Sequence, residues 1–133
     1  MVGTEGEMRL LLTAEPESVG TARRAVSDLA RRLGIEEPAL GDLKTIVSEA
    51  CSNVVRHAYP EGDGSFEVEA LLEGSNLTIV VRDSGAGMRP LVQNEHSSLR
   101  LGLGLISTLS SHFEISDSPG GGTEVLMQIP LPP

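Results

Sequence analysis

The sequence predicts an α+β fold, a two-layer sandwich with helices on one face of a mixed, mostly antiparallel sheet. The chain has 133 residues and is 39% hydrophobic, which suits one globular domain with a real core but not two. Apolar residues recur with strand spacing, then twice with helical spacing, and then in paired runs separated by turn residues. The predicted order β-α-α-β-β-loop-α-β-β favours separate layers of helices and strands. We expect a flexible start at residues 1–7 and a single domain over residues 8–133.

The first half of the chain is predicted to form one strand and two helices. Met8–Thr13 is a compact, mostly apolar run that is typical of a strand. Pro16 and its acidic neighbours favour the start of a helix, and Gly34 suits the position just after a helix end. A second helix is expected from near Pro38 to Tyr59, because the residue before a proline disfavours the helical region.

The second half of the chain is predicted to contain four strands, one helix and a long loop. The strands cover residues 65–72, 77–83, 112–117 and 123–129, and the helix covers residues 102–111. Gly, Ser, Asn and Pro mark the turns of two expected hairpins. Residues 84–101 contain glycine, proline and polar residues without clear periodicity. A segment of this length is expected to be a functional loop or a lid rather than a simple connection.

Charge and cysteine content narrow the classes of function and location. The formal net charge of −9 leaves no basic stripe to neutralise phosphates, so we expect no direct contact with nucleic acid. The single cysteine, Cys51, provides no disulfide framework, which favours a reducing cytoplasm. The start of the chain lacks a signal-peptide pattern, and no apolar run is long enough to predict a membrane span. We therefore expect a cytoplasmic protein with no membrane partner.

Glu49 and Asn53 are the first candidate site residues. They are four positions apart in the second predicted helix, so they share one face about a turn apart. An Asn carbonyl oxygen is a hard ligand that suits Mg²⁺, which takes its other oxygens from waters and phosphates. A Glu one turn away can accept a proton from an attacking hydroxyl or water. The alternative, two solvated residues on an amphipathic helix, is the commoner explanation of this spacing taken alone.

Asp83, Gly85 and Gly87 form a second candidate group. Asp83 ends an apolar strand, and the two glycines follow at once. A carboxylate at a strand end can accept the exocyclic amino group of adenine, whereas guanine presents a carbonyl at that position. The glycines would let the backbone approach the ring and turn sharply. An ordinary turn after a strand is the alternative, because Asp and Gly are common turn residues.

Gly102 and Gly104 lie where the long loop is expected to become a helix. Free N–H groups and the helix dipole favour phosphate at such a position, and Arg100 just before it could add a cationic contact. Thr123 follows three glycines and could place its hydroxyl near the base, through a water shared with Asp83. A glycine-rich helix start and a β-branched residue that opens a strand are the alternatives. The segment matches neither a P-loop nor a Rossmann fingerprint.

Taken in order, these motifs resemble those of the GHKL ATPases, a superfamily that includes gyrase, heat-shock chaperone ATPases, mismatch-repair ATPases and histidine kinases. Within it, the chain resembles most the small bacterial anti-sigma-factor serine kinases. The first matching segment is similar to the N-box, the next two to the glycine boxes, and the last to the terminal Gly-Thr. These segments are Glu49-Ala-Cys-Ser-Asn53-Val-Val-Arg-His57-Ala-Tyr59, Asp83-Ser-Gly85-Ala-Gly87-Met88, Arg100-Leu-Gly102-Leu-Gly104-Leu105-Ile106 and Gly121-Gly-Thr123.

The resemblance implies a Bergerat fold of the HATPase_c type that binds ATP or ADP with Mg²⁺, with residues 88–101 as the ATP lid. It implies a homodimer and a protein-serine kinase that phosphorylates a serine of a STAS-domain anti-anti-sigma protein. It also implies an anti-sigma factor, which holds a sigma factor inactive until the anti-anti-sigma protein displaces it. The resemblance covers almost the whole chain, from about residue 10 to residue 131.

The resemblance also assigns roles to individual residues. Glu49 would be the general base for the substrate serine, and Asn53 would be the Mg²⁺ ligand. Asp83 would bind adenine, His57 would border the nucleotide, and Arg100 would contact phosphate or the partner. The residues expected to shape the pocket are Gly85, Gly87, Met88, Gly102, Leu103, Gly104 and Thr123.

A nucleotide-gated binding module, which captures partners without phosphorylating them, is the main alternative function. Glu49 favours the kinase, because a protein that only binds needs no base at that position. A detached histidine-kinase catalytic domain is disfavoured, since the 133 residues contain no dimerisation helix with a phospho-acceptor histidine. A hydrolytic ATPase related to gyrase is disfavoured for a similar reason, since no transducer domain is found.

Overall fold

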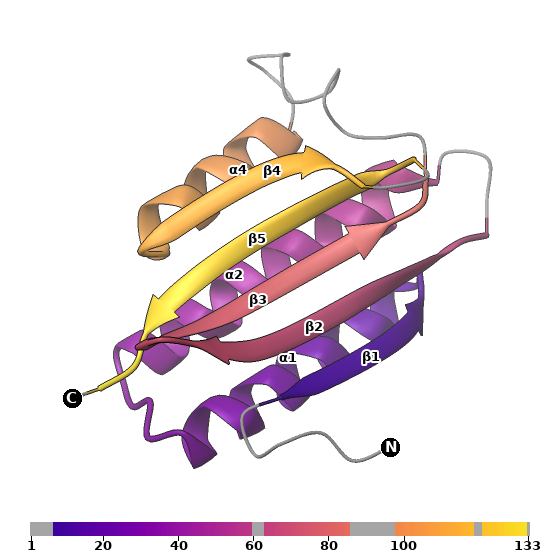
Figure 1. Ribbon diagram of the computed structural model, residues 1–133. Helices are drawn as coiled ribbons and strands as arrows, with labels where there is room; N and C mark the ends of the chain where they lie inside the picture. The colour runs from indigo at the N-terminus through magenta and orange to yellow at the C-terminus, as the bar shows by residue number, and fades with distance from the viewer. Residues whose placement is uncertain (1–6, 60–62, 86–97, 119–120, 133) are drawn as a thin grey trace.

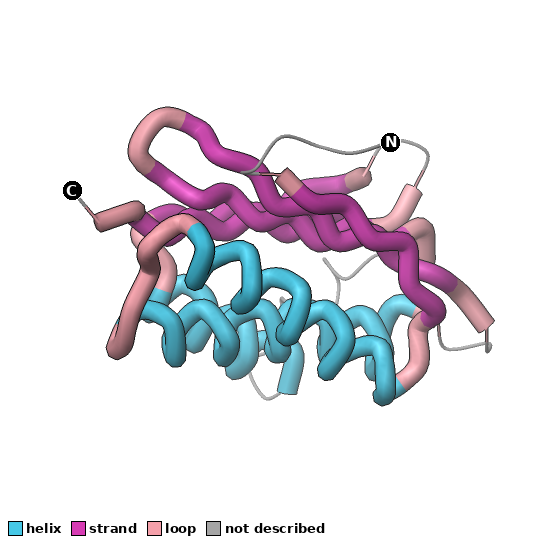
Figure 2. The backbone as a smooth tube through the Cα atoms, turned by 90° about the horizontal axis from the view of Figure 1, so that it is seen from below, coloured by secondary structure: helices cyan, strands magenta, loops and turns pink. Residues whose placement is uncertain are grey.

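The computed structural model describes residues 7–59, 63–85, 98–118 and 121–132, which form two layers. The strands are β1 (Met8–Thr13), β2 (Ser65–Glu73), β3 (Asn76–Asp83), β4 (His112–Asp117) and β5 (Thr123–Pro130), and the helices are α1 (Pro16–Arg32), α2 (Ala39–Asn53), its π-helical extension η1 (Val54–Ala58), and α4 (Ser98–Leu109). Figure 2 shows the helices on one side of the sheet, which confirms the predicted α+β class. None of the helices in the described segments is long and apolar enough to span a membrane.

The sheet has five strands in the order β1-β2-β3-β5-β4, and each pairing is antiparallel. After β1 the chain reverses direction in α1 and again in α2, and it reverses once more to enter β2 (Figure 1). Strand β2 therefore runs opposite to β1. The same series of reversals, through α4 and β4, separates β3 from β5. Two hairpins complete the sheet. The described sheet is therefore antiparallel throughout rather than mixed.

The core lies between the sheet and the helices, and α2 is its central element. This helix contacts α1 and α4 on either side and packs against β3 and β5. Its apolar stripe includes Leu43, Ile46 and Val47, all fully buried. Each such side chain contributes about 1.5–3 kcal/mol through its burial. Cys51 on the same helix is also fully buried, as its position beside the apolar stripe indicates, and burial raises the pKa of its thiol to about 12.

Helix α4 differs from its predicted start. It begins at Ser98, four positions before residue 102, so Gly102 and Gly104 lie within the helix rather than at its first turn. Glycine costs a helix interior about 1 kcal/mol relative to alanine, which is why the sequence suggests a later start. Packing of the fully buried Ile106 against the core favours the helix here. Within the expected lid, residues 88–97 lie outside the described residues and residues 98–101 form the first turn of α4.

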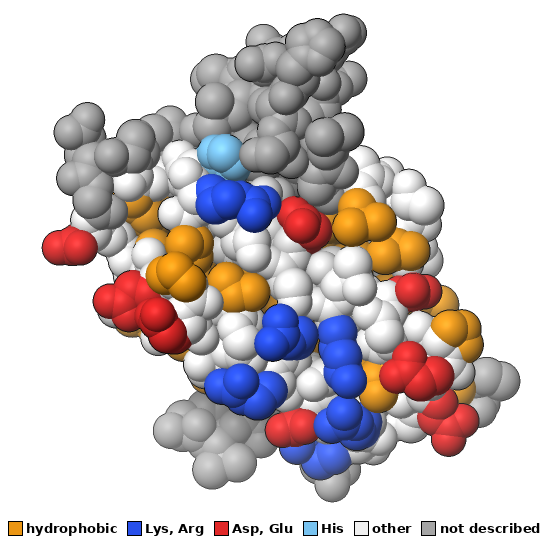
Figure 3. All heavy atoms as spheres, turned by 180° about the vertical axis from the view of Figure 1, so that it is seen from behind, with side chains coloured by type: hydrophobic (Ala, Val, Ile, Leu, Met, Phe, Trp, Pro, Cys, Tyr) orange, Lys and Arg blue, Asp and Glu red, His pale blue; other side chains and the backbone are white. Residues whose placement is uncertain are grey.

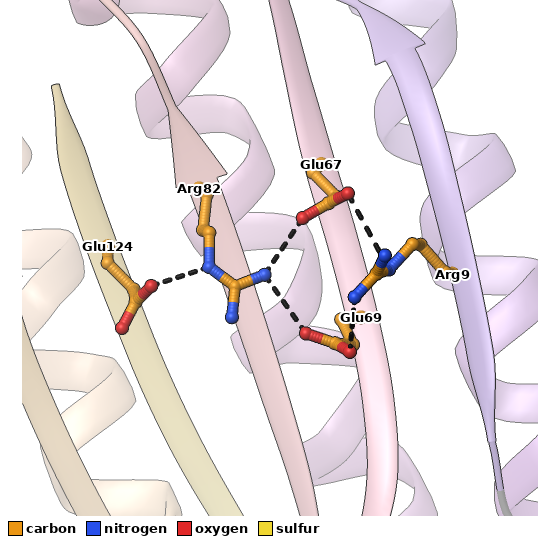
Figure 4. A network of polar contacts seen from close by, with 5 residues as sticks. All are labelled: Arg9, Glu67, Glu69, Arg82 and Glu124. Atoms are coloured by element: carbon orange, nitrogen blue, oxygen red, sulfur yellow. Dashed lines mark hydrogen bonds and ion pairs between the residues drawn. The ribbon is translucent and has the colours of Figure 1, made fainter. Parts of the chain in front are cut away.

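The open face of the sheet carries a network of charged side chains (Figure 4). Arg82 on β3 lies 2.5 Å from Glu124, 2.8 Å from Glu67 and 2.9 Å from Glu69. Arg9 on the edge strand contacts Glu69 at 3.0 Å and Glu67 at 3.6 Å. Burial opposes the charge of Arg82, but the hydrogen bonds to these carboxylates outweigh it and raise the pKa of the guanidinium. One arginine thus joins three adjacent strands.

Replacing Arg82 by methionine should destabilise the fold by about 1–2 kcal/mol, because three neighbouring carboxylates lose their shared counter-ion. Arg9→Met is the matched control and should cost less, since the Arg9 side chain is 64% exposed. Urea denaturation at low and high salt measures both effects. The difference between Arg82→Met and the wild type should shrink in high salt, where repulsion among the carboxylates is screened. Equal losses for the two variants would contradict a central role for Arg82.

Candidate functional site

Asp83 lies at the end of β3 on the face of the sheet that packs against the helices. Leu77, Ile79 and Val81 precede it on that buried face, because alternate residues of a strand point to the same side. Asp83 is 2% exposed. Oδ1 accepts the backbone N–H of Gly85 at 2.9 Å, whereas Oδ2 is buried and has no hydrogen-bond partner among the described residues.

The environment of Asp83 disfavours its negative charge. Burial raises the pKa of the carboxyl group, and hydrogen bonding from the backbone of Gly85 and Thr123 offsets part of that effect. A buried carboxylate oxygen without a donor is costly. The exocyclic amino group of a purine would supply the missing donor, so this orphaned atom fits the adenine that the motif predicts.

The beginning of β5 lies beside Asp83. Arg82 pairs with Glu124, which places Thr123 next to Asp83, and Thr123 is 1% exposed. Gly122 has φ +86°, and a Cβ atom there would lie 2.0 Å from the Asp83 carbonyl oxygen. Only glycine permits both this conformation and this approach. The two strand ends therefore meet through their backbones.

The π-helical turn η1 closes the other side of this strand end. A Cβ atom on Gly85 would lie 2.0 Å from the carbonyl oxygen of Ala58, the last residue of η1. The next side chain, Tyr59, accepts the backbone N–H of Ser84 at 2.9 Å and donates its own hydroxyl to the carbonyl of Ser65. These contacts hold the end of α2 against the Asp83–Gly85 turn. Widened π-turns of this kind are frequent at functional sites.

Glu49, Asn53 and His57 follow one another at one-turn intervals along α2 and η1. Asn53 is fully buried, and the Glu49 side chain is 28% exposed. The Arg56 guanidinium joins them, with Nη2 at 3.1 Å from Asn53 Oδ1 and 3.5 Å from Glu49 Oε2. On the helix-covered face in Figure 3, a basic side chain lies next to a histidine, and an acidic side chain lies beyond the basic one. An amide oxygen and a carboxylate together form a donor set that suits Mg²⁺.

His57 is half-buried beside this group. Burial lowers its pKa, and the neighbouring charge of Arg56 lowers it further. Both effects favour the neutral form of the imidazole. A neutral ring can lie beside a nucleotide without adding a cation to the site.

The glycine-rich start of α4 is not arranged as the sequence predicts. Only the first four N–H groups of a helix are free of intrahelical partners, and in α4 these belong to residues 98–101. They include the backbone N–H of Arg100, whereas Gly102, Leu103 and Gly104 lie further along the helix. Gly104 is exposed, and no described atom lies within 4 Å of the position of a Cβ atom on it. The helix-terminus argument for phosphate thus applies to residues 98–101.

The structure brings together two groups of the predicted residues. Asp83, Gly85 and Thr123 form one group, and Glu49 and Asn53 form the other. Gly87 and Met88 lie outside the described residues. Sequence reasoning gave no role to Arg56, Tyr59 and Gly122. A signal existed for Arg56, which is three positions after Asn53 and seven after Glu49 and therefore shares their helix face.

The family of the chain follows from comparison with known proteins. The model of the histidine kinase-like ATPase domain matches residues 12–129. The chain belongs to this family. It is 31% identical over 129 residues to an anti-sigma F factor of Thermoanaerobacter sp. (strain X514), an alignment that covers 90% of each chain. It is 33% identical over 128 residues to a serine-protein kinase RsbW of Halalkalibacterium halodurans, covering 85% of this chain and 77% of that protein.

The fold also matches a solved structure of the RsbU and RsbW domains of a Mycobacterium tuberculosis protein. The TM-score is 0.73 at 23% identity, and the match covers 94% of this chain and 32% of the other. At this identity the likeness concerns the fold alone. It agrees with the family assignment, and the resemblance inferred from the motifs is confirmed.

Alanine at Gly122 should destabilise the protein more than alanine at Gly121. Both glycines have positive φ, but a Cβ atom on Gly121 meets no described atom within 4 Å, whereas one on Gly122 strikes the Asp83 carbonyl. Gly121→Ala should therefore cost about 1–2 kcal/mol from backbone strain alone. Gly122→Ala should cost clearly more, as measured by urea denaturation. Equal losses would show that the strands do not meet as closely as the structure indicates.

Proposed function

We propose that this protein is an ATP-dependent protein-serine kinase and an anti-sigma factor. The observation that carries the proposal is the buried Asp83 carboxylate with one unpartnered oxygen, in a member of the histidine kinase-like ATPase domain family. Similarity to an anti-sigma F factor and to a serine-protein kinase over most of the chain supports both parts of the function.

At the adenine end, Asp83 Oδ2 would accept the exocyclic amino group of the base. Guanine presents a carbonyl oxygen at that position, which would face the carboxylate without a proton between them. Gly85 would shape this end of the site through its close contact with the Ala58 carbonyl, and the Thr123 hydroxyl would lie near the same edge. Asp83 is buried at this end, and its Oδ1 accepts the backbone N–H of Gly85.

At the phosphate end, Asn53 Oδ1 would ligate Mg²⁺, which neutralises charge on the transferring phosphate. Glu49 would accept the proton of the substrate serine hydroxyl. The serine oxygen would then form a bond to the γ-phosphorus, while the bond from that phosphorus to the β–γ bridging oxygen breaks and ADP leaves. The free N–H groups at residues 98–101 and the Arg100 side chain would contact phosphate.

The remaining predicted residues keep their proposed roles around the nucleotide. His57 would border it from η1. The residues that would complete the pocket wall are Gly87, Met88, Gly102, Leu103 and Gly104, and residues 88–101 would be the ATP lid.

For the partners, we propose a sigma factor and a STAS-domain anti-anti-sigma protein whose serine is phosphorylated. We also propose that the protein acts as a homodimer in the cytoplasm. A nucleotide-gated binding module with the same fold is the second candidate. The Glu49 carboxylate favours the kinase, since it is partly exposed and one turn from the metal ligand on the same face of α2.

Glu49→Gln should abolish phosphate transfer and spare ATP binding. The change keeps the shape of the side chain but removes its basicity, so transfer should fall by at least about 100-fold. The immobilised protein is incubated with native extract and Mg-ATP or Mg-ADP, and phosphosites on captured proteins are mapped by mass spectrometry. A STAS-domain protein with a new phosphoserine is expected with the wild type and with Glu36→Gln, an exposed control. Nucleotide-dependent capture without phosphorylation would support the binding module instead.

Asp83→Asn should bind ATP more weakly by roughly 1–3 kcal/mol, because it loses a charged acceptor. The raised pKa of Asp83 means that the folded protein binds this proton more tightly than the unfolded chain, so ionised Asp83 costs stability at neutral pH. That cost disappears as the pH falls from the raised pKa of Asp83 in the folded protein towards the ordinary pKa of an aspartate in the unfolded chain. The variant should thus be at least as stable as the wild type at neutral pH and lose this advantage in acid.

ATP titration and urea denaturation at several pH values measure the two effects of Asp83→Asn. Asp28→Asn is the control, since Asp28 is an exposed aspartate of α1 that pairs with Arg31. Its ATP affinity should match that of the wild type. Unchanged ATP affinity in Asp83→Asn would remove Asp83 from the binding site.

A further inference from the structure

The Arg56 guanidinium contacts both functional oxygens of α2 through a single nitrogen. Nη2 donates to Asn53 Oδ1 at 3.1 Å and lies 3.5 Å from Glu49 Oε2. The Arg56 side chain is 47% exposed, so it can swing into solvent without disturbing the core. Asn53 is fully buried, and its Nδ2 has no partner among the described residues. Arg56 is therefore the group that holds the Asn53 amide from its oxygen side.

Arginine has only donors, so it fixes which atom of an amide faces it. Contact with Arg56 presents the oxygen of Asn53, the atom suited to a metal, on the side of the helix where Glu49 lies. The same contact opposes a metal ion, because the guanidinium already takes this oxygen and carries a positive charge. Presetting one of two amide orientations favours a metal by at most about twofold. Displacing a charge-assisted hydrogen bond costs more than that. The net effect of Arg56 is therefore to weaken metal binding at Asn53 Oδ1.

We propose that Arg56 is a positioning residue that holds Glu49 and Asn53 together, and that a divalent cation must displace its guanidinium from Asn53 Oδ1 in order to bind. The inference rests on the proposed function, since it takes Asn53 as the metal ligand and Glu49 as the base. Arg56 thereby sets the concentration of Mg²⁺ that nucleotide binding requires. The displaced guanidinium no longer bridges the two side chains, so arrival of the metal also releases Glu49 from this contact.

Two other roles for Arg56 give different results in the same measurement. If Arg56 contacted a phosphate of the nucleotide, its loss would weaken binding with and without Mg²⁺. If Arg56 only stabilised the surface of the helix, its loss would leave nucleotide binding unchanged both with and without Mg²⁺. A competitor of the metal ion is distinguished by an effect that depends on Mg²⁺.

The test compares Arg56→Met with the wild type in titrations of a fluorescent ADP analogue, in EDTA and across a series of Mg²⁺ concentrations. The Mg²⁺ concentration at half-maximal binding should fall by roughly three- to tenfold in the variant. Affinity in EDTA should change by less than about twofold. Arg24→Met is the matched control, because it removes one positive charge from an exposed position on α1, and it should behave as the wild type. Circular dichroism melting establishes that each variant is folded.

An unchanged Mg²⁺ midpoint, or weaker binding in EDTA as well as in Mg²⁺, would overturn the role proposed for Arg56. Those results would leave the proposed function intact, since the wild type would still bind Mg-nucleotide. Failure of the wild type to bind the analogue at all would overturn the proposed function itself, and with it this inference. As a second readout, serine phosphorylation by Arg56→Met should exceed that of the wild type at limiting Mg²⁺ and match it at saturation.

Discussion

Burial of the Asp83 carboxylate is the constraint on which the geometry of the site depends. Asp83 is 2% exposed, and a buried carboxylate must find donors nearby or destabilise the fold. The backbones of Gly85 and Thr123 supply donors, and the turn to Gly85 brings that residue so close to Ala58 that no Cβ atom fits. Gly122 makes the equivalent approach from β5. The unpartnered Oδ2 atom lowers the stability of the fold and is available to accept a hydrogen bond from a ligand.

The two ends of the site differ in exposure, and the difference suits a kinase that acts on another protein. At the Asp83 end, the residue is 2% exposed and lies against η1 and the start of β5 through close backbone contacts. At the other end, the Glu49 and Arg56 side chains are 28% and 47% exposed. The proposed role of Glu49 as the base for a serine of a second protein would need this access. Asn53, one turn after Glu49 on α2, is fully buried.

Local patterns predicted much of the fold and part of the site. The bounds of β1 and β4 agree with prediction because short apolar runs between turn residues define them, and Asp83 follows directly from its place at a strand end. The start of α4 was predicted too late, since the glycines at 102 and 104 disfavour a helix that tertiary packing stabilises. The contact of Arg56 with Asn53 and Glu49 was missed, although the spacing of these residues on one helix face is a local feature.

The sequence by itself determined the class of fold, the order of its elements and the alignment of Glu49 and Asn53 on one helix face, because each depends on spacing along the chain. The tertiary structure decided which distant segments meet. Pairing of β3 with β5 places Thr123 beside Asp83, and docking of η1 places Ala58 against Gly85. The burial that leaves Asp83 Oδ2 without a partner results from the same packing. Such contacts depend on strand register and packing between elements, which no local pattern specifies.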